Sequence, residues 1–230
     1  MSRQMILAAA VAVLGLGAWY VTTPSSSSSS ARVSAQNEAL LGAANAQETG
    51  DIDISTIKDM QIGNPDAPVT VIEYASYTCP HCANFHAGTY KQLKADYIDT
   101  GKINFVYREV YFDRYGLWAS AVARCADTPT SFFGISDLIY STQAEWSRAG
   151  EPAAIVEELR KIGRLAGLGN EQLEACLTDQ DKLRTLVAWY QHNAEADGIS
   201  STPSFVINGK KYQNMAYPDM VEIIEEASGS

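Results

Sequence analysis

Apolar residues at strand and helix spacing follow one another in the middle of this chain. Residues 69–76 (VTVIEYAS) predict a buried strand, the apolar positions of residues 79–97 predict a helix, and residues 103–108 (INFVYR) predict a second strand. Because a helix connects these two strands, we expect them to run parallel with a right-handed crossover. This pattern is typical of an α/β protein.

A second set of strand-like segments lies near the C-terminus. Residues 204–207 and 210–213 flank Asn208-Gly209, a dipeptide that favours a β-hairpin with a type I′ turn. A last helix is expected from about Pro218, because proline suits the first turn of a helix. These segments supply the other half of the same core.

The long region between these two sets has helical periodicity. From residue 114 to residue 197, apolar residues recur at helical spacing and no strand-like alternation interrupts them. We therefore predict an α/β core formed by residues 61–113 and 198–230, whose order of strands and helices resembles a thioredoxin-like fold. An inserted all-helical domain at residues 114–197 divides this core.

An uncharged apolar run occupies residues 5–21, behind Arg3. It predicts that residues 1–21 are either a signal peptide or a membrane anchor. The anchor is favoured, because the best small-residue cleavage site lies well downstream of the run. Both interpretations export the rest of the chain. Residues 22–60 contain a polyserine run followed by small and polar residues, which predict a flexible tether.

Charge and cysteine content narrow the classes of function. The chain has 27 acidic and 17 basic residues, a net charge of −10, and no basic stripe, which argues against a nucleic-acid ligand. Its four cysteines fit an oxidising compartment. Cys125 and Cys176 each lie on an apolar helical face. They are either two buried free thiols or a structural disulfide, and the even cysteine count of an exported protein favours the disulfide.

The tetrad Cys79-Pro80-His81-Cys82 stands where the first predicted strand meets the following helix. A C-x-x-C at such a junction is a thioredoxin-like redox signature. Cys79 is expected at the helix N-terminus, where free N–H groups and the helix dipole favour a thiolate. Cys82 is expected to be more buried and to resolve a mixed disulfide. His81 can donate a hydrogen bond or positive charge to the Cys79 sulfur.

A zinc site is the alternative interpretation of this motif, with Cys79, Cys82 and His86 as ligands. A structural zinc site needs four ligands, and the sequence contains no second C-x-x-C and no H-x-x-x-H. We therefore expect neither a metal nor another cofactor. His86 and His192 are then expected to be ordinary surface or boundary histidines.

Two further positions are candidates near this motif. Glu73 lies inside the first predicted strand. It is either a buried acid that takes a proton from Cys82 or a side chain that reaches solvent at the strand edge. Pro203 follows Thr202 at the start of the third predicted strand, a position that tolerates proline.

Residues 71–82 (VIEYASYTCPHC), the helical insertion and residues 198–212 (GISSTPSFVINGKKY) resemble the DsbA family of thiol:disulfide oxidoreductases. The resemblance covers roughly residues 61–227. It implies that Pro203 is the family's cis-proline, which faces the active-site disulfide and helps to bind extended substrate chains next to Thr202. It also implies that Glu73 is the family's buried acid.

The sequence departs from the family pattern in two places. Thr202 resembles the residue found in disulfide isomerases of the same superfamily, whereas many DsbA proteins carry valine. Residues 103–108 contain no lysine to pair with Glu73. In addition, Cys125 and Cys176 resemble a subgroup with a second, structural disulfide.

The resemblance predicts a periplasmic oxidase that is tethered to the inner membrane. It would donate its Cys79–Cys82 disulfide to reduced, newly exported proteins, and a quinone-coupled integral-membrane partner would reoxidise it. Isomerases usually dimerise through an additional N-terminal domain, which residues 22–60 are too short and too polar to supply, so we expect a monomer. The alternatives are a disulfide isomerase or reductase, an electron donor dedicated to one maturation pathway, and a zinc-stapled binding module without catalysis.

Overall fold

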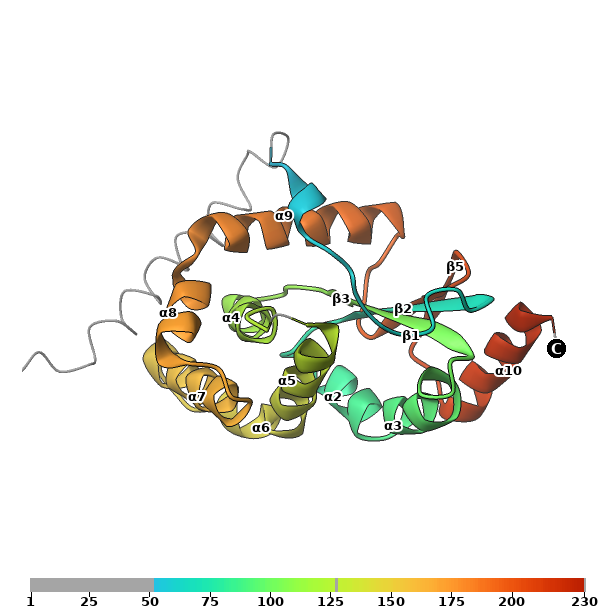
Figure 1. Ribbon diagram of the computed structural model, residues 1–230, viewed down its shortest axis with the longest axis horizontal. Helices are drawn as coiled ribbons and strands as arrows, with labels where there is room; N and C mark the ends of the chain where they lie inside the picture. The colour runs from blue at the N-terminus through green and yellow to red at the C-terminus, as the bar shows by residue number, and fades with distance from the viewer. Residues whose placement is uncertain (1–51, 127, 230) are drawn as a thin grey trace, which may run out of the picture.

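Five strands form one mixed sheet in the order β1-β3-β2-β4-β5 (Figure 1). This computed structural model describes residues 52–126 and 128–229. The strands are β1 (Met60–Gly63), β2 (Val69–Ala75), β3 (Ile103–Glu109), β4 (Ser204–Ile207) and β5 (Lys210–Gln213). As predicted, β2 and β3 run parallel, and β4 and β5 form an antiparallel hairpin.

The central strands of the sheet are more buried than its two edge strands. The central strands β3, β2 and β4 are buried along most of their length, whereas the edge strands β1 and β5 are partly exposed. The lysines of β5 suit an exposed edge. At the hairpin turn, Asn208 and Gly209 have φ of 45° and 83°, which is the left-handed backbone that a type I′ turn requires.

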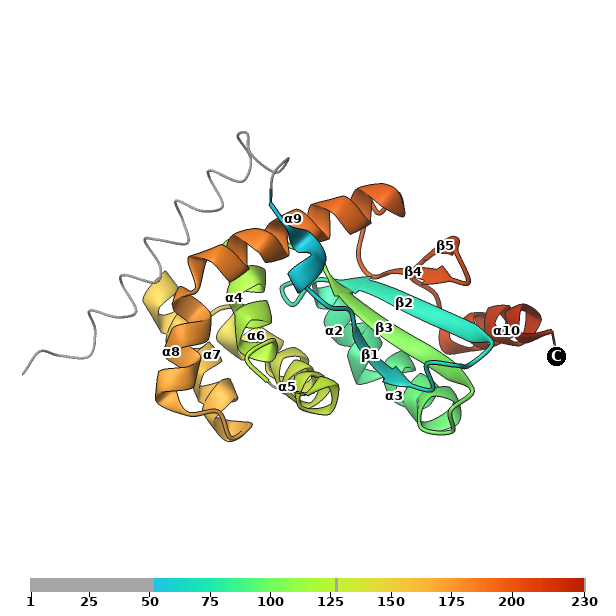
Figure 2. The same cartoon turned by 45° about the horizontal axis from the view of Figure 1, so that its top comes forward.

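The helix expected over residues 79–97 is interrupted. It consists of α2 (Pro80–Ala87), α3 (Thr89–Leu93) and a π-helical turn, η2 (Lys94–Ile98). The break falls at Gly88, whose φ of −123° and ψ of −85° leave the helical region. Together with α10 (Tyr217–Ser228), these helices lie on one side of the sheet, while α9 (Gln180–Ala196) lies on the other (Figures 1 and 2).

The segment between β3 and β4 forms a lobe of helices. They are α4 (Arg114–Ala123), α5 (Pro129–Ser141), α6 (Gln143–Trp146), α7 (Pro152–Leu165), α8 (Asn170–Thr178) and α9. Side chains of Asp113, Thr128 and Asp179 cap α4, α5 and α9, which satisfies backbone N–H groups at these helix starts. One hydrophobic cluster continues from the sheet into this lobe, so the two parts pack as one body.

A disulfide joins two elements of this lobe. Cys125, directly after α4, is bonded to Cys176 in α8, with a separation of 51 residues along the chain. The sequence left open whether these two cysteines are free thiols or a disulfide, and the structure shows the disulfide.

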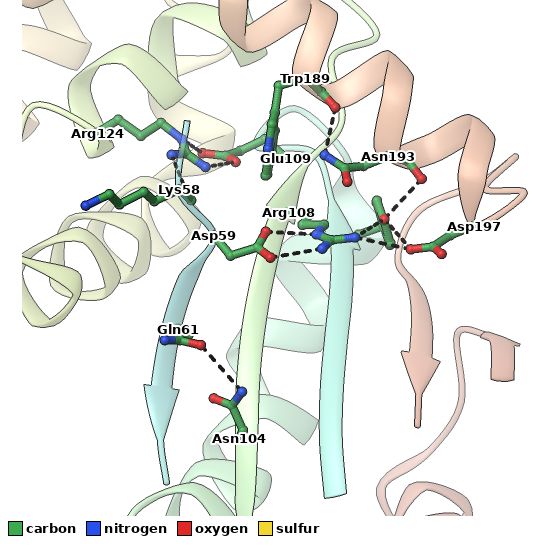
Figure 3. A network of polar contacts seen from close by, with 11 residues as sticks. Lys58, Asp59, Gln61, Asn104, Arg108, Glu109, Arg124, Trp189, Asn193 and Asp197 are labelled. Carbon is green, nitrogen blue, oxygen red and sulfur yellow. Dashed lines mark hydrogen bonds and ion pairs between the residues drawn. The ribbon is translucent and has the colours of Figure 1, made fainter. Parts of the chain in front are cut away.

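The start of the described chain is packed against the sheet and α9. Ile54–Thr56 form a 3-10 turn, η1, and Met60 opens β1, which pairs with β3. Arg108 of β3 binds both carboxylate oxygens of Asp59 at 2.8 and 2.9 Å (Figure 3). The expected end of the tether at residue 60 is therefore too late.

Two expectations for the N-terminal region fall on residues outside the described part. They are the signal peptide or anchor at residues 1–21 and most of the tether. Within residues 52–126 and 128–229, no helix is both long enough and apolar enough to cross a membrane.

Candidate active site

Cys79 occupies the N-cap of α2, directly after the loop that leaves β2. Its φ and ψ are extended, Pro80 is the first helical residue, and the carbonyl of Cys79 accepts the first helical hydrogen bond from Ala83 at 3.2 Å. Proline at this position loses no hydrogen bond, because the first N–H of a helix has no partner within the helix. The Cys79 sulfur therefore lies at the positive end of the α2 dipole.

The helical lobe holds the loop that carries Cys79. Gln143 of α6 donates hydrogen bonds to the carbonyls of Tyr77 and Cys79 at 2.8 and 2.9 Å. Thr78 donates to Asp113 at 2.7 Å, and the same carboxylate caps α4. These contacts join loop and lobe, so the lobe fixes the position of the reactive cysteine.

The two thiols of the tetrad differ sharply in acidity. The pKa of Cys79 is lowered from 9.0 to about 5, chiefly by the hydrogen bond from the Cys82 thiol and further by Thr202 and the N–H groups of Cys82 and His81. Burial raises the pKa of Cys82 far above its ordinary value, and the contact with Cys79 and the nearby Glu73 raise it further. Cys79 is thus a thiolate at neutral pH and Cys82 remains a thiol.

The two residues between the cysteines of the tetrad are solvent-exposed. Pro80 and His81 are both exposed, whereas Cys79 is half-buried and Cys82 is buried. His81 lowers the pKa of Cys79 through its backbone N–H. The ring contact between His81 and the Cys79 sulfur therefore stays a prediction.

Thr202 and Pro203 lie beside the reactive cysteine. The Thr202–Pro203 peptide bond is cis, and the Cys79 thiol contacts the Thr202 carbonyl oxygen at 3.5 Å. Among the described residues, the buried Thr202 Oγ1 has no hydrogen-bond partner. Thr202 also lowers the pKa of Cys79, which makes a Cys79 thiolate the candidate acceptor for this hydroxyl.

Glu73 is completely buried in the middle of β2, so it does not reach solvent at the strand edge. Its carboxylate oxygens lie 3.1 and 3.0 Å from Nε2 of His86, and the side chains of both residues are at most 3% exposed. The expectation that His86 is a surface or boundary residue is therefore wrong, because α2 turns it into the core. His192, by contrast, is exposed.

The zinc interpretation loses its proposed third ligand in this arrangement. His86 directs Nε2 at Glu73. In the part of the chain that the structure describes, no group of three or more His, Cys, Asp or Glu side chains could hold a metal ion.

A groove of about 600 Å³ runs beside α2, between this helix and the lobe. Its lining includes Pro80 of the tetrad, His86, Tyr140 of α5 and Gln143 of α6. Tyr140 stacks on the His86 ring with centroids 4.1 Å apart. The groove therefore passes from the exposed tetrad to the buried histidine.

Sequence reasoning missed His86, Tyr140, Gln143 and Asp113. For His86 a signal existed, since it follows Cys82 by one helical turn, and residues at that spacing share a helix face. If Cys82 is buried, His86 is expected to be buried too. The other three residues come from the lobe, and no local pattern connects them to the tetrad.

The strand-turn-helix with a C-x-x-C at the helix start, opposite a cis X-Pro bond on a mixed sheet, defines a protein of the thioredoxin class. The family model described as Thioredoxin matches residues 55–226, so the chain belongs to this family. Within it, the chain is a DsbA-family protein, as its fold and relatives agree.

Three relatives illustrate this placement. A Rickettsia bellii protein whose name proposes a protein-disulfide oxidoreductase is 37% identical over 169 residues, 74% of this chain. Disulfide bond formation protein D of Bacillus subtilis is 27% identical over 72% of this chain and 75% of its own length. The crystal structure of Wolbachia pipientis alpha-DsbA1 has a TM-score of 0.69 and 26% identity, covering 75% of this chain and 92% of that one. The chain spans 64% of the length of the Rickettsia bellii protein.

Proposed function

We propose that this protein is a thiol:disulfide oxidoreductase that donates its Cys79–Cys82 disulfide to reduced proteins exported across the membrane. The observation that carries this proposal is the difference in acidity between the two thiols, with the pKa of Cys79 at about 5 and that of Cys82 strongly raised. A stabilised Cys79 thiolate favours the reduced form of the couple, and a favoured reduced form makes the disulfide a strong oxidant.

The reaction consists of two exchanges at sulfur. A substrate thiolate attacks Cys79 Sγ, a new S–S bond forms, and the bond to Cys82 breaks with the electron pair going to Cys82 Sγ. A second substrate thiolate then attacks the mixed disulfide and displaces Cys79 as its thiolate. The substrate leaves oxidised, and Cys79 and Cys82 are reduced. Cys79 is the better leaving group of the pair because its pKa is low.

The surroundings of Cys79 suit an extended polypeptide substrate. Cys79 is half-buried, and Thr202 and Pro203 stand beside it ahead of β4. In this proposal the substrate chain passes along Thr202 and Pro203, which orient its cysteine toward Cys79. Glu73 accepts or returns the proton of Cys82.

The N-terminal sequence supports the cellular setting of this proposal. Residues 5–21 are apolar and uncharged, which supports export and an anchor in the inner membrane facing the periplasm. A monomer tethered there would be reoxidised by a quinone-coupled membrane protein. The names of the Rickettsia bellii and Bacillus subtilis relatives refer to disulfide formation or exchange and support the substrate class.

The test is oxidation of a reduced, unfolded substrate protein by the purified full chain, followed by counting the remaining free thiols. We expect one substrate disulfide per oxidised enzyme, and loss of this activity in Cys79→Ala. If Cys79→Ala kept full activity, the proposed mechanism would be wrong.

Thr202 favours a second candidate function, an isomerase or reductase. The reduction potential of the Cys79–Cys82 couple separates the two, since an oxidase is expected at about −120 mV and a reductase at about −270 mV. We expect the value to lie closer to the former, because of the low pKa of Cys79.

A further inference from the structure

The Glu73 carboxylate is completely buried inside the protein. It is 0% exposed, and β2 places it between Tyr107 of β3 and Phe205 of β4. Across the described residues, the His86 ring is its hydrogen-bond partner, through Nε2 alone. An isolated buried carboxylate is costly, so the state of Glu73 depends on this histidine.

The short contact between these two groups requires a proton. A carboxylate oxygen and an unprotonated ring nitrogen are both acceptors, and they do not approach to 3.0 Å without a hydrogen between them. Either His86 carries it on Nε2 or Glu73 carries it as a carboxylic acid. The pair therefore holds a buried proton one helical turn from Cys82, the sulfur that becomes a thiol when the Cys79–Cys82 bond is broken.

Unlike Glu73, His86 reaches a cavity. His86 is among the residues that line the groove of about 600 Å³, although its side chain is only 3% exposed. Its ring packs face to face on Tyr140 and at a tilt on Tyr90, with centroids 4.1 and 4.6 Å apart. Because Nε2 is bound to Glu73, Nδ1 is the second proton site of the ring. Titratable or charged groups surround the pair from each packed element: Cys82 on α2, Tyr90 and Lys91 on α3, Tyr107 on β3, and Asp137 and Tyr140 on α5.

We propose that His86 is a positioning residue that orients Glu73 and carries protons between Glu73 and water in the groove whenever Cys82 changes between disulfide and thiol. This inference rests on the proposed exchange at Cys79–Cys82 and specifies how its proton travels. Residues 103–108 supply no lysine for this purpose, and their strand, β3, faces Glu73 with Tyr107 instead.

The attacking thiolate forms an S–S bond with Cys79, and the bond between Cys79 and Cys82 breaks with its electron pair on Cys82 Sγ. The Glu73–His86 pair gives one proton to this sulfur, which becomes a thiol. Groove water then supplies a replacement proton at Nδ1 and leaves as hydroxide, and movement of the ring proton from Nδ1 to Nε2 restores the hydrogen bond to Glu73. Reoxidation runs the same path in reverse, and the raised pKa of Cys82 ensures that the proton is taken up.

Two substitutions at His86 separate proton transfer from positioning. His86→Gln keeps an N–H donor for Glu73 but has no site that exchanges a proton, whereas His86→Phe keeps the ring packing and loses the donor. His192→Gln, on the exposed face of α9, is the matched control. The probe is reduced glutathione, and the rate at which it reduces the Cys79–Cys82 disulfide is followed across pH in the full-length variants.

We expect His86→Gln to slow reduction at neutral pH by at least about tenfold, as general acid catalysis typically contributes more than that. Its midpoint of thermal unfolding and the ionisation of Cys79 should stay near the wild-type values, and His192→Gln should match wild type. His86→Phe should slow reduction at least as much. If His86→Gln kept the wild-type rate and pH profile, His86 would be merely structural and the proposal would fail.

A second readout does not depend on rates. The NMR signals of the His86 ring should report a change of protonation between the oxidised and reduced forms of the wild-type protein, and an unchanged ring would overturn the proposal even if His86→Phe failed to fold. A protein that passes both tests but never oxidises a protein substrate would instead contradict the proposed function and leave the role of His86 standing.

Discussion

Arg124, at the C-terminal end of α4, binds both carboxylate oxygens of Glu109 at the end of β3, at 2.5 and 2.7 Å. The two side chains are 3% and 1% exposed. Arg124 also donates to the carbonyl of Lys58 at 3.1 Å (Figure 3). One buried ion pair thus ties together the sheet, the helical lobe and the segment that enters β1.

Breaking this pair from one side should strongly destabilise the fold. Glu109→Gln removes the negative charge and leaves the buried guanidinium uncompensated, which costs about 3–5 kcal/mol of unfolding free energy. The matched control is Glu158→Gln in the exposed pair with Lys161, expected to cost less than about 1 kcal/mol. Urea unfolding of the disulfide-intact proteins measures both, and equal effects would contradict the prediction.

The ionisation of Cys79 should make the stability of the reduced protein depend on pH. Its pKa is about 5 in the folded protein against an ordinary value of 9.0. The stabilisation is therefore complete above about pH 9 and is lost as pH falls toward about 5. The oxidised protein has no thiol here and lacks this dependence. Ultraviolet absorbance of the thiolate should titrate near pH 5 and vanish in Cys79→Ala, and a midpoint near 9 would contradict the assignment.

Thr202→Val should raise the pKa of Cys79 and make the disulfide less oxidising. Valine has nearly the shape of threonine but lacks the hydroxyl that is placed to donate to the thiolate. Thiolate titration and equilibrium with glutathione measure the two changes together. Thr185→Val, a substitution at a partly exposed position of α9 whose hydroxyl donates to the Asp181 carbonyl, is the control and should change neither. Potential and pKa that move independently would contradict the link between thiolate stability and oxidising power.

The elements that could be predicted from the sequence are those whose signals are local. The hairpin at Asn208-Gly209 follows from turn chemistry, and both residues take the positive φ that the turn needs. The parallel pairing of β2 and β3 follows from the helix that connects them. Cys79 at a helix start follows from the strand-to-helix change of pattern and from Pro80.

The features that could not be predicted depend on distant contacts. β1 has four residues and a half-exposed pattern, and it exists because Met60 to Gly63 pair with a strand far along the chain. The burial of His86 requires Tyr140 of α5 to pack on its ring, and the loop before α2 is held by Gln143 of α6. Periodicity predicts which face of a helix is buried, but not which polar group of another element meets it.

The Cys125–Cys176 disulfide is expected to contribute stability and no redox activity. It closes a loop of 51 residues between α4 and α8, whereas the reactive loop is held by other contacts, through Gln143. On the chain-entropy model a loop of this length stabilises the fold by about 4 kcal/mol. Replacing both cysteines by alanine should therefore lower the unfolding free energy by about this amount.

The same double variant should oxidise a reduced substrate at close to the wild-type rate at a temperature where it remains folded. The low pKa of Cys79 comes from Cys82, Thr202 and local N–H groups, none of which belongs to the elements that this bond joins. Parallel measurements of urea unfolding and substrate oxidation test the two halves of the prediction. A large loss of activity with unchanged stability would contradict a purely structural role. It would mean that the Cys125–Cys176 disulfide exchanges with Cys79–Cys82.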